Sequence, residues 1–186
     1  SGVVVTNYHV VEGATAVSVT VATTGGTYQA EVLGADPESD VAVLQLDGAD
    51  DLAVVDLDDD GVSVDEAVTA VGNAEGQGYL SASTGTVTSL EESITTAAEQ
   101  GIEGEDLTGL IQTDAYVVGG YSGGALLDDE GEVVGIATAA SSSTRVAESY
   151  AVPIEDALAV VAQVESGEES GTVRIGASAY LGVGVD

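Results

Sequence analysis

The feature that most constrains the fold is a long series of short β-prone segments separated by turn-forming residues. The segments are rich in Val, Thr, Ile and Leu, and Gly, Asp, Asn and Ser lie between them. No long helical pattern precedes residue 153. The pattern therefore predicts an all-β sandwich or barrel. The expected strands cover residues 3–5, 16–22, 27–33, 41–46, 68–71, 85–89, 110–113, 125–127, 133–138 and 150–152.

Two other segments depart from this pattern. After Pro153, the apolar residues Ile154, Leu158 and Val161 share one helical stripe, and Gly167 is a stop signal. This predicts a single amphipathic C-terminal helix. Residues 91–106 are polar and contain glycine, which predicts a long, mobile surface loop.

The residue types available for a core also favour strands. Phe, Trp, Met and Cys are absent, so Val, Ala, Leu, Ile and seven Tyr must fill the interior of this 186-residue chain. Such a β-branched core packs well in sheets. Without Cys the chain has neither disulfides nor thiolate metal sites. No apolar run approaches the roughly 18 residues that a membrane span needs.

The charge of the chain excludes some partners. Thirty-three acidic residues against two basic ones give a net charge of −31, far beyond the magnitude of roughly 2–8 that suits a small soluble domain. This argues against nucleic-acid binding, because phosphate contacts need clustered Lys and Arg. Self-repulsion is relieved when the Debye length falls to about 3 Å near 1 M salt. We therefore expect a salt-rich habitat.

A lone serine among glycines lies at Gly120–Gly124, between two apolar runs. Glycines permit positive φ and close approach of a substrate backbone. Such a loop suits a nucleophile whose neighbouring N–H groups point at a developing oxyanion. Taken alone, the motif fits a glycine-rich hairpin loop equally well.

Two further residues make the serine more informative. His9, the single histidine, follows the first predicted strand, and Asp40 precedes the segment 41–46. A lone histidine is more often structural, and Asp40 is one acid among many. The order His9, Asp40, Ser122, however, matches the chain order His, Asp, Ser of chymotrypsin-fold enzymes.

Seven short blocks along the chain strengthen this match because they occur in a fixed order. They are TNYHVV at Thr6–Val11, DPESDVAVL at Asp36–Leu44, AVGN at Ala70–Asn73, TGTVTS at Thr84–Ser89, IQTDA at Ile111–Ala115, GYSGG at Gly120–Gly124 and YAVPI at Tyr150–Ile154. Over roughly residues 1–165 the chain resembles the protease domain of the HtrA (DegP/DegQ-type) serine proteases.

The resemblance implies a domain organisation. It implies a trypsin-like protease domain over residues 1–166, built from two antiparallel β-barrels at about 1–75 and 80–152 and a helix at about 154–166. Residues 167–186 resemble a linker and the start of a truncated PDZ domain. Because the sequence begins at Ser1, we expect it to be an excised or processed piece whose opening strand is missing or shortened.

The resemblance also implies residue roles. Ser122 would be the nucleophile, His9 the general base and Asp40 the residue that orients the imidazole. The N–H groups of Gly120 and Ser122 would form the oxyanion hole. Tyr121 replaces the family's usual Asn, and its bulk could disturb this loop. A catalytically inactive peptide-binding relative is therefore the alternative.

The substrate pocket is expected from the same alignment. Tyr116 would lie at its base, with Val117 and the strand Gly135, Ile136 and Ala137 as walls. An uncharged pocket excludes Arg and Lys as the preferred residue, so small to medium aliphatic side chains are expected before the scissile bond.

The implied function is a serine endopeptidase that cleaves unfolded or misfolded proteins in extracytoplasmic protein quality control. No metal or organic cofactor is expected, and the family makes a homotrimer possible. The acidic turn Asp56–Gly61 copies the first half of an EF-hand loop. Its twelfth position is Ala67 instead of Glu, which favours a solvated turn over a calcium site.

Overall fold

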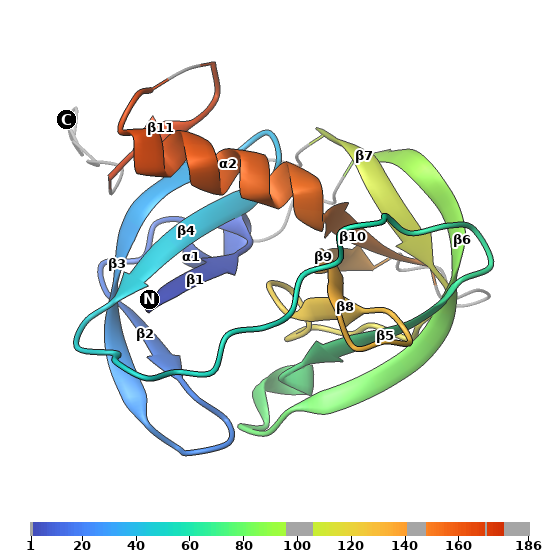
Figure 1. Cartoon of the computed structure of the whole chain (residues 1–186), viewed down its shortest axis with the longest axis horizontal. Helices are drawn as coiled ribbons and strands as arrows, with labels where there is room; N and C mark the ends of the chain where they lie inside the picture. Colours follow the sequence, from blue (N-terminus) through green and yellow to red (C-terminus); the bar gives the residue numbers. More distant parts are fainter. Residues whose placement is uncertain (1, 96–105, 141–147, 170, 177–186) are drawn as a thin grey trace, which may run out of the picture.

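The computed structural model describes residues 2–95, 106–140, 148–169 and 171–176, and it describes residues 139 and 140 by their backbone alone. Two curled β-sheets lie side by side, and a single long helix crosses over both of them (Figure 1). This confirms the predicted all-β class with a C-terminal helix. Neither described helix is both long and apolar enough to cross a membrane.

The first sheet is five-stranded and antiparallel, in the order β1-β4-β3-β11, with β2 also paired to β3. Its strands are β1 (Val3–Thr6), β2 (Val17–Thr20), β3 (Thr27–Asp36), β4 (Val41–Leu46) and β11 (Arg174–Ile175). The short helix α1 (Tyr8–Val11) follows β1. Strand β4 is buried on both faces: Ala42 and Leu44 face the first core, and Val41 and Val43 face the second sheet and the long helix.

The second sheet is a closed barrel in the order β10-β7-β6-β5-β8-β9. Its strands are β5 (Ala67–Gly72), β6 (Ser81–Thr95), β7 (Asp106–Thr113), β8 (Ala125–Leu127), β9 (Val133–Ala140) and β10 (Ser149–Pro153), and the 3₁₀ turn η1 (Ala74–Gly76) joins β5 to β6. Small and β-branched residues fill its interior, among them Val68, Ala70, Val87 and Val134. This is the core that a chain without Phe, Trp or Met must build.

The helix α2 (Ile154–Ser166) joins the two halves, because its buried face packs in one cluster with residues of β4, β7, β9 and β10. Gly167 ends it in the left-handed conformation, as predicted, with its N–H bonded to the Val164 carbonyl oxygen at 3.1 Å. The predicted stripe is wrong at Leu158, which is 37% exposed, whereas Val161 is half-buried and packs against the core cluster. The buried positions of the helix are Ile154, Ala157, Val160 and Val164.

Two other expectations change. The predicted surface loop over residues 91–106 is wrong at both ends, since β6 runs to Thr95 and β7 begins at Asp106, and these two residues pair. Residues 96–105 lie outside the described part of the chain. Beyond the helix, Arg174 and Ile175 pair with β3 and so extend the first sheet. Of the predicted linker and PDZ lead-in over residues 167–186, residues 170 and 177–186 lie outside the described residues, and the PDZ assignment stays a prediction.

Candidate active site

His9 and Asp40 meet because of strand register. Strand β1 pairs antiparallel with β4, with Thr6 opposite Ala42, so the end of one strand lies beside the start of the other. The His9 Nδ1 atom is 2.8 Å from Asp40 Oδ2 and 3.0 Å from Oδ1. The His9 backbone N–H also donates to Asp40 Oδ1, at 2.9 Å. Asp40 is fully buried, whereas the His9 side chain is 35% exposed.

Hydrogen-bond donors from other residues bind both the backbone carbonyl oxygen and the carboxylate of Asp40. Its φ of 52° lies in the left-handed region, where a non-glycine residue needs support from its surroundings. The Asp40 carbonyl oxygen accepts the Tyr8 N–H at 3.2 Å and the Asn7 Nδ2–H at 3.0 Å. The Thr138 hydroxyl donates to Asp40 Oδ2 from strand β9 of the second sheet. The carboxylate therefore receives hydrogen bonds from both halves of the molecule.

Ser122 lies on the loop between β7 and β8 of the second sheet. Its hydroxyl donates to the Thr138 carbonyl oxygen at 3.1 Å. Thr138 thus contacts Asp40 through its side chain and Ser122 through its backbone. The three residues that the sequence singled out, His9, Asp40 and Ser122, are brought into one region around this single β9 residue.

The backbone around Gly120 has a defined orientation. The Gly119 carbonyl oxygen accepts the Glu75 N–H at 2.7 Å, and the Gly120 carbonyl oxygen accepts the Asn73 N–H at 3.0 Å. In a trans peptide the C=O and the following N–H point in opposite directions. The Gly120 N–H therefore points away from Glu75. Gly120 has a φ of 92°, and a Cβ there would lie 2.1 Å from the Asn73 carbonyl oxygen, so only glycine fits.

The N–H groups of this loop fall into two sets. Those of Tyr121 and Gly124 donate to the carbonyl oxygens of Val118 and Tyr121. Within the described ranges, those of Gly120 and Ser122 have no protein acceptor. The two N–H groups on either side of Tyr121 are thus not used by the protein itself, and their role as an oxyanion hole stays a prediction.

The Tyr121 ring occupies the interior of the second barrel. Its residue is only 4% exposed and belongs to the barrel core. Gly72 makes the room: a Cβ at that position would lie 2.6 Å from the Tyr121 Cα and 3.0 Å from its Cγ. The Tyr121 side chain, which was expected to disturb the loop, is therefore packed against β5.

The five residues expected to form the substrate pocket differ in their surroundings. Tyr116 is 68% exposed, whereas Val117 belongs to the core of the second barrel. Ile136 packs in a different cluster, which includes α2. Gly135 and Ala137 are buried in β9. The side chains of Val117 and Ile136 are thus committed to packing, and the location of a substrate pocket stays a prediction.

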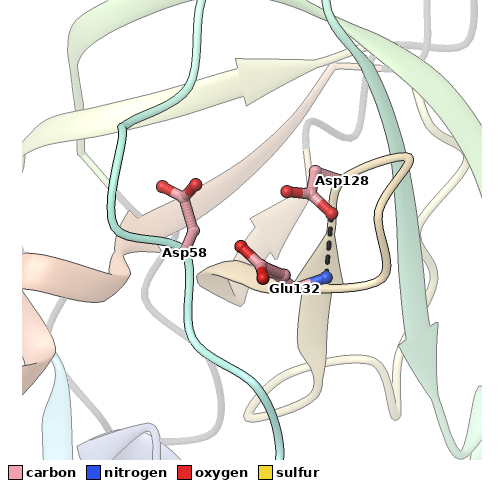
Figure 2. Close-up of side chains that lie close together, drawn as sticks. All are labelled: Asp58, Asp128 and Glu132. Atoms are coloured by element: carbon pink, nitrogen blue, oxygen red, sulfur yellow. Dashed lines mark hydrogen bonds between the residues drawn. The ribbon is translucent and has the colours of Figure 1, made fainter.

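A second group of carboxylates lies close together in the described part of the chain. Asp58 precedes β5, while Asp128 and Glu132 lie on the turn between β8 and β9, and one oxygen from each residue lies within 4.8 Å of the others (Figure 2). Asp128 Oδ1 accepts the N–H groups of Glu130 at 3.0 Å and Glu132 at 2.8 Å. Sequence reasoning found the Asp56–Gly61 turn but missed these neighbours, which only strand pairing brings close.

The acidic group shows the signs of mutual repulsion. Desolvation, followed by the charges of Asp128 and Glu130, raises the pKa of the Glu132 carboxyl. A hydrogen bond and the charge of Asp58 raise the pKa of the Asp60 carboxyl. Carboxylate oxygens are ligands that hard cations accept, but exposed acids are common in so acidic a chain, and we assign no ion to this group.

Comparison with known proteins places the chain in a class. Residues 1–136 match the family model of the trypsin-like peptidase domain. Together with the two curled sheets and the site between His9 and Ser122, this match defines a trypsin-like peptidase domain.

Individual relatives narrow the class. A probable serine protease do-like protein of Buchnera aphidicola subsp. Acyrthosiphon pisum is 35% identical over 185 residues, which is 98% of this chain and 36% of that protein. The periplasmic serine endoprotease DegP of Escherichia coli K12 is 36% identical over 155 residues, 82% of this chain and 31% of that protein. A structure of the HtrA-type protease AlgW with a tripeptide superimposes with a TM-score of 0.76 at 32% identity, covering 90% of this chain and 54% of that one. The chain belongs to the HtrA family of serine proteases, and it spans about a third of the length of these curated relatives.

Proposed function

We propose that this chain is the catalytic domain of a serine endopeptidase in which Ser122, His9 and Asp40 form the catalytic triad. The observation that carries the proposal is the contact of His9 Nδ1 with the fully buried Asp40 carboxylate, at 2.8 Å, beside the loop that holds Ser122. With its Nδ1–H donated to Asp40, the imidazole presents Nε2 as the base.

The reaction then follows from these positions. His9 Nε2 takes the Ser122 hydroxyl proton as the Ser122 oxygen attacks the scissile carbonyl carbon, and Asp40 stabilises the imidazolium. The hydroxyl turns from the Thr138 carbonyl oxygen toward His9 for this step. The N–H groups of Gly120 and Ser122 bind the oxyanion, each contributing about 2.7–4 kcal/mol. His9 gives the proton to the leaving amine, and water hydrolyses the acyl-enzyme.

The substrate is proposed to be an extended segment of an unfolded or misfolded protein. Such a segment is proposed to bind by β-augmentation, in which main-chain hydrogen bonds to a strand give affinity. Small to medium aliphatic residues are proposed before the scissile bond. DegP of Escherichia coli is named a periplasmic serine endoprotease, and a related protease Do-like 1 of Arabidopsis thaliana is chloroplastic. We propose an extracytoplasmic role in protein quality control.

Digestion of a denatured protein tests this function. The chain is incubated with a permanently unfolded, fluorescently labelled protein and with the same protein folded, from low salt to about 1 M NaCl. Cleavage of the unfolded form, with cuts after aliphatic residues mapped by mass spectrometry, is expected. Ser122→Ala abolishes cleavage, whereas Ser18→Ala, at an exposed position of β2, does not. A folded chain that cuts nothing at any salt concentration contradicts the proposal and favours the inactive peptide-binding relative.

A further inference from the structure

Asn7 is a fully buried polar residue that the mechanism above does not use. Its Nδ2–H donates to the Asp40 carbonyl oxygen at 3.0 Å. Its Oδ1 accepts the Gly123 N–H at 2.6 Å, across 116 positions of sequence. One side chain therefore touches the residue that holds His9 and the residue that follows Ser122.

Each end of the Asn7 amide fixes a backbone that needs support. At one end Asp40 has a φ of 52°, and the Asn7 and Tyr8 donors both bind its carbonyl oxygen. At the other end the Gly123 N–H is shared between Asn7 and the Ala137 carbonyl oxygen, 2.8 Å away. Gly123 also lies against Thr6, where a Cβ would come within 2.2 Å of the Thr6 hydroxyl. The serine loop is thus seated directly on the end of β1.

The chemistry of this position selects a carboxamide. The Asp40 carbonyl oxygen needs a donor, and the Gly123 N–H needs an acceptor. Asn offers both on one planar group, whereas Asp offers no donor when ionised and Leu offers neither. In a fully buried place, a polar group left without its hydrogen-bond partner destabilises the fold.

From these contacts we propose that Asn7 is a positioning residue whose carboxamide sets the His9–Asp40 pair in register with Ser122 across the two halves of the molecule. This inference rests on the proposed peptidase function. Thr138, on β9 of the second sheet, likewise contacts both Asp40 and Ser122. The two halves are therefore joined at the site by one residue from each sheet. Since a misplacement of about 1 Å can cost about 10²-fold in rate, losing one link should slow catalysis more than it weakens substrate binding.

Two substitutions test the two hydrogen bonds of the Asn7 carboxamide. Asn7→Asp keeps an acceptor for Gly123 but places a carboxylate against the Asp40 carbonyl oxygen. Asn7→Leu removes both hydrogen bonds and keeps an apolar volume. We expect kcat for a peptide substrate to fall about 10²-fold in both variants, with KM changed less than about threefold. Rates are measured on protein shown to be folded by circular dichroism.

A matched control distinguishes positioning from simple loss of stability. Val164→Ala removes a buried contact between α2 and the first sheet, away from the serine. It should lower Tm and leave kcat unchanged. A second readout does not depend on turnover: His9 is the only histidine, so a ¹⁵N-histidine-labelled sample gives one imidazole spectrum. We expect Asn7→Asp to shift that spectrum and Val164→Ala to leave it unchanged.

The outcomes separate the inference from the function on which it rests. Asn7 variants with wild-type kcat and an unchanged imidazole spectrum overturn the positioning role while the peptidase function stands. A loss of kcat that Val164→Ala reproduces at equal Tm overturns it as well. If the wild-type chain cleaves nothing but Asn7→Asp still shifts the His9 spectrum, the proposed function fails. The positioning of His9 and Asp40 by Asn7 is then upheld.

Discussion

The carboxylate of Asp40 and the three neighbouring carboxylates of Asp58, Asp128 and Glu132 have different surroundings. Asp40 is fully buried and receives hydrogen bonds from the backbone and ring of His9 and from Thr138. Asp58, Asp128 and Glu132 lie near one another, and the pKa of Glu132 is raised by burial and by its acidic neighbours. The residue type is similar, but only Asp40 has donors from two sheets around it.

The comparison shows what gives a carboxylate a role in so acidic a protein. With 33 acidic residues in the chain, an acid alone carries little information. The donors around Asp40 come from residues 31 and 98 positions away. What distinguishes Asp40 is that the pairing of β1 with β4 and the position of β9 bring hydrogen-bond donors to its carboxylate.

The largest effect is expected from Asp40→Asn. Asparagine replaces one of the two carboxylate oxygens with an NH₂ donor, so the group can no longer accept hydrogen bonds at both the Oδ1 and the Oδ2 positions, and the imidazole loses its tautomer and orientation. By analogy with the same change in a serine protease triad, kcat should fall about 10⁴-fold. Steady-state kinetics on a peptide substrate measure it. Asp58→Asn, made in the group with Asp128 and Glu132, should leave kcat within about twofold. Equal losses of kcat in the two variants would contradict the difference between the two sites.

A smaller loss is expected from Thr138→Val, which removes the hydroxyl donor to Asp40 and keeps the carbonyl oxygen that contacts Ser122. A hydrogen bond to a charged group contributes about 1.5–3 kcal/mol, so kcat should drop about tenfold or more. Ser89→Ala is the control, because it removes a hydroxyl donor to the Glu92 carboxylate at 2.6 Å outside the site. Unchanged kcat in Thr138→Val would mean that the cross-sheet bond does not orient Asp40.

Asp128 should matter for stability alone. Asp128→Ala removes the acceptor of two backbone N–H groups in the β8–β9 turn and is expected to cost about 1 kcal/mol, or a Tm about 2–4 °C lower. Asp128→Asn keeps the acceptor and removes the charge, so its Tm at low salt should equal or exceed that of wild type. Calorimetry compares the two, and a lower Tm in both would point to a stabilising role for the charge.

The smallest effect is expected from Glu132→Gln. Because its pKa is raised on folding, the folded state binds the proton more tightly than the unfolded state, and stability falls as pH rises through that range. The full cost is present at neutral pH, so the substitution should raise Tm at pH 7 and low salt. The gain should vanish at acidic pH, where Glu132 is protonated. It should shrink near 1 M NaCl, where the repulsion by Asp128 and Glu130 is screened and the cost of desolvation remains. A Tm gain independent of both would exclude charge repulsion as its cause.

Much of the fold could be predicted from the sequence because its signals are local. The short β-prone apolar segments predicted β1, β4 and β8 closely, and Gly167 marked the end of α2. Where the signal depended on neighbours, prediction failed. Leu158 and Ala157 are both compatible with a helical stripe, and only the approach of α2 to the sheets decides which is buried.

The candidate site divides in the same way. The order of His9, Asp40 and Ser122 could be found from short motifs. Thr138 and Asn7 could not, because a hydrogen bond between Asn7 and Gly123 depends on how two separate sheets meet. The Tyr121 ring was likewise a puzzle in sequence, since its space is provided by Gly72, forty-nine positions earlier.

The most direct test of the triad is covalent labelling with a fluorophosphonate, which reacts only where a serine, its base and an oxyanion hole act together. The wild-type chain, folded in salt up to about 1 M, should gain one adduct that mass spectrometry locates on Ser122. Ser122→Ala should gain none, and Asp40→Asn should label far more slowly. Absence of labelling at every salt concentration, or an adduct on another residue, would contradict the account.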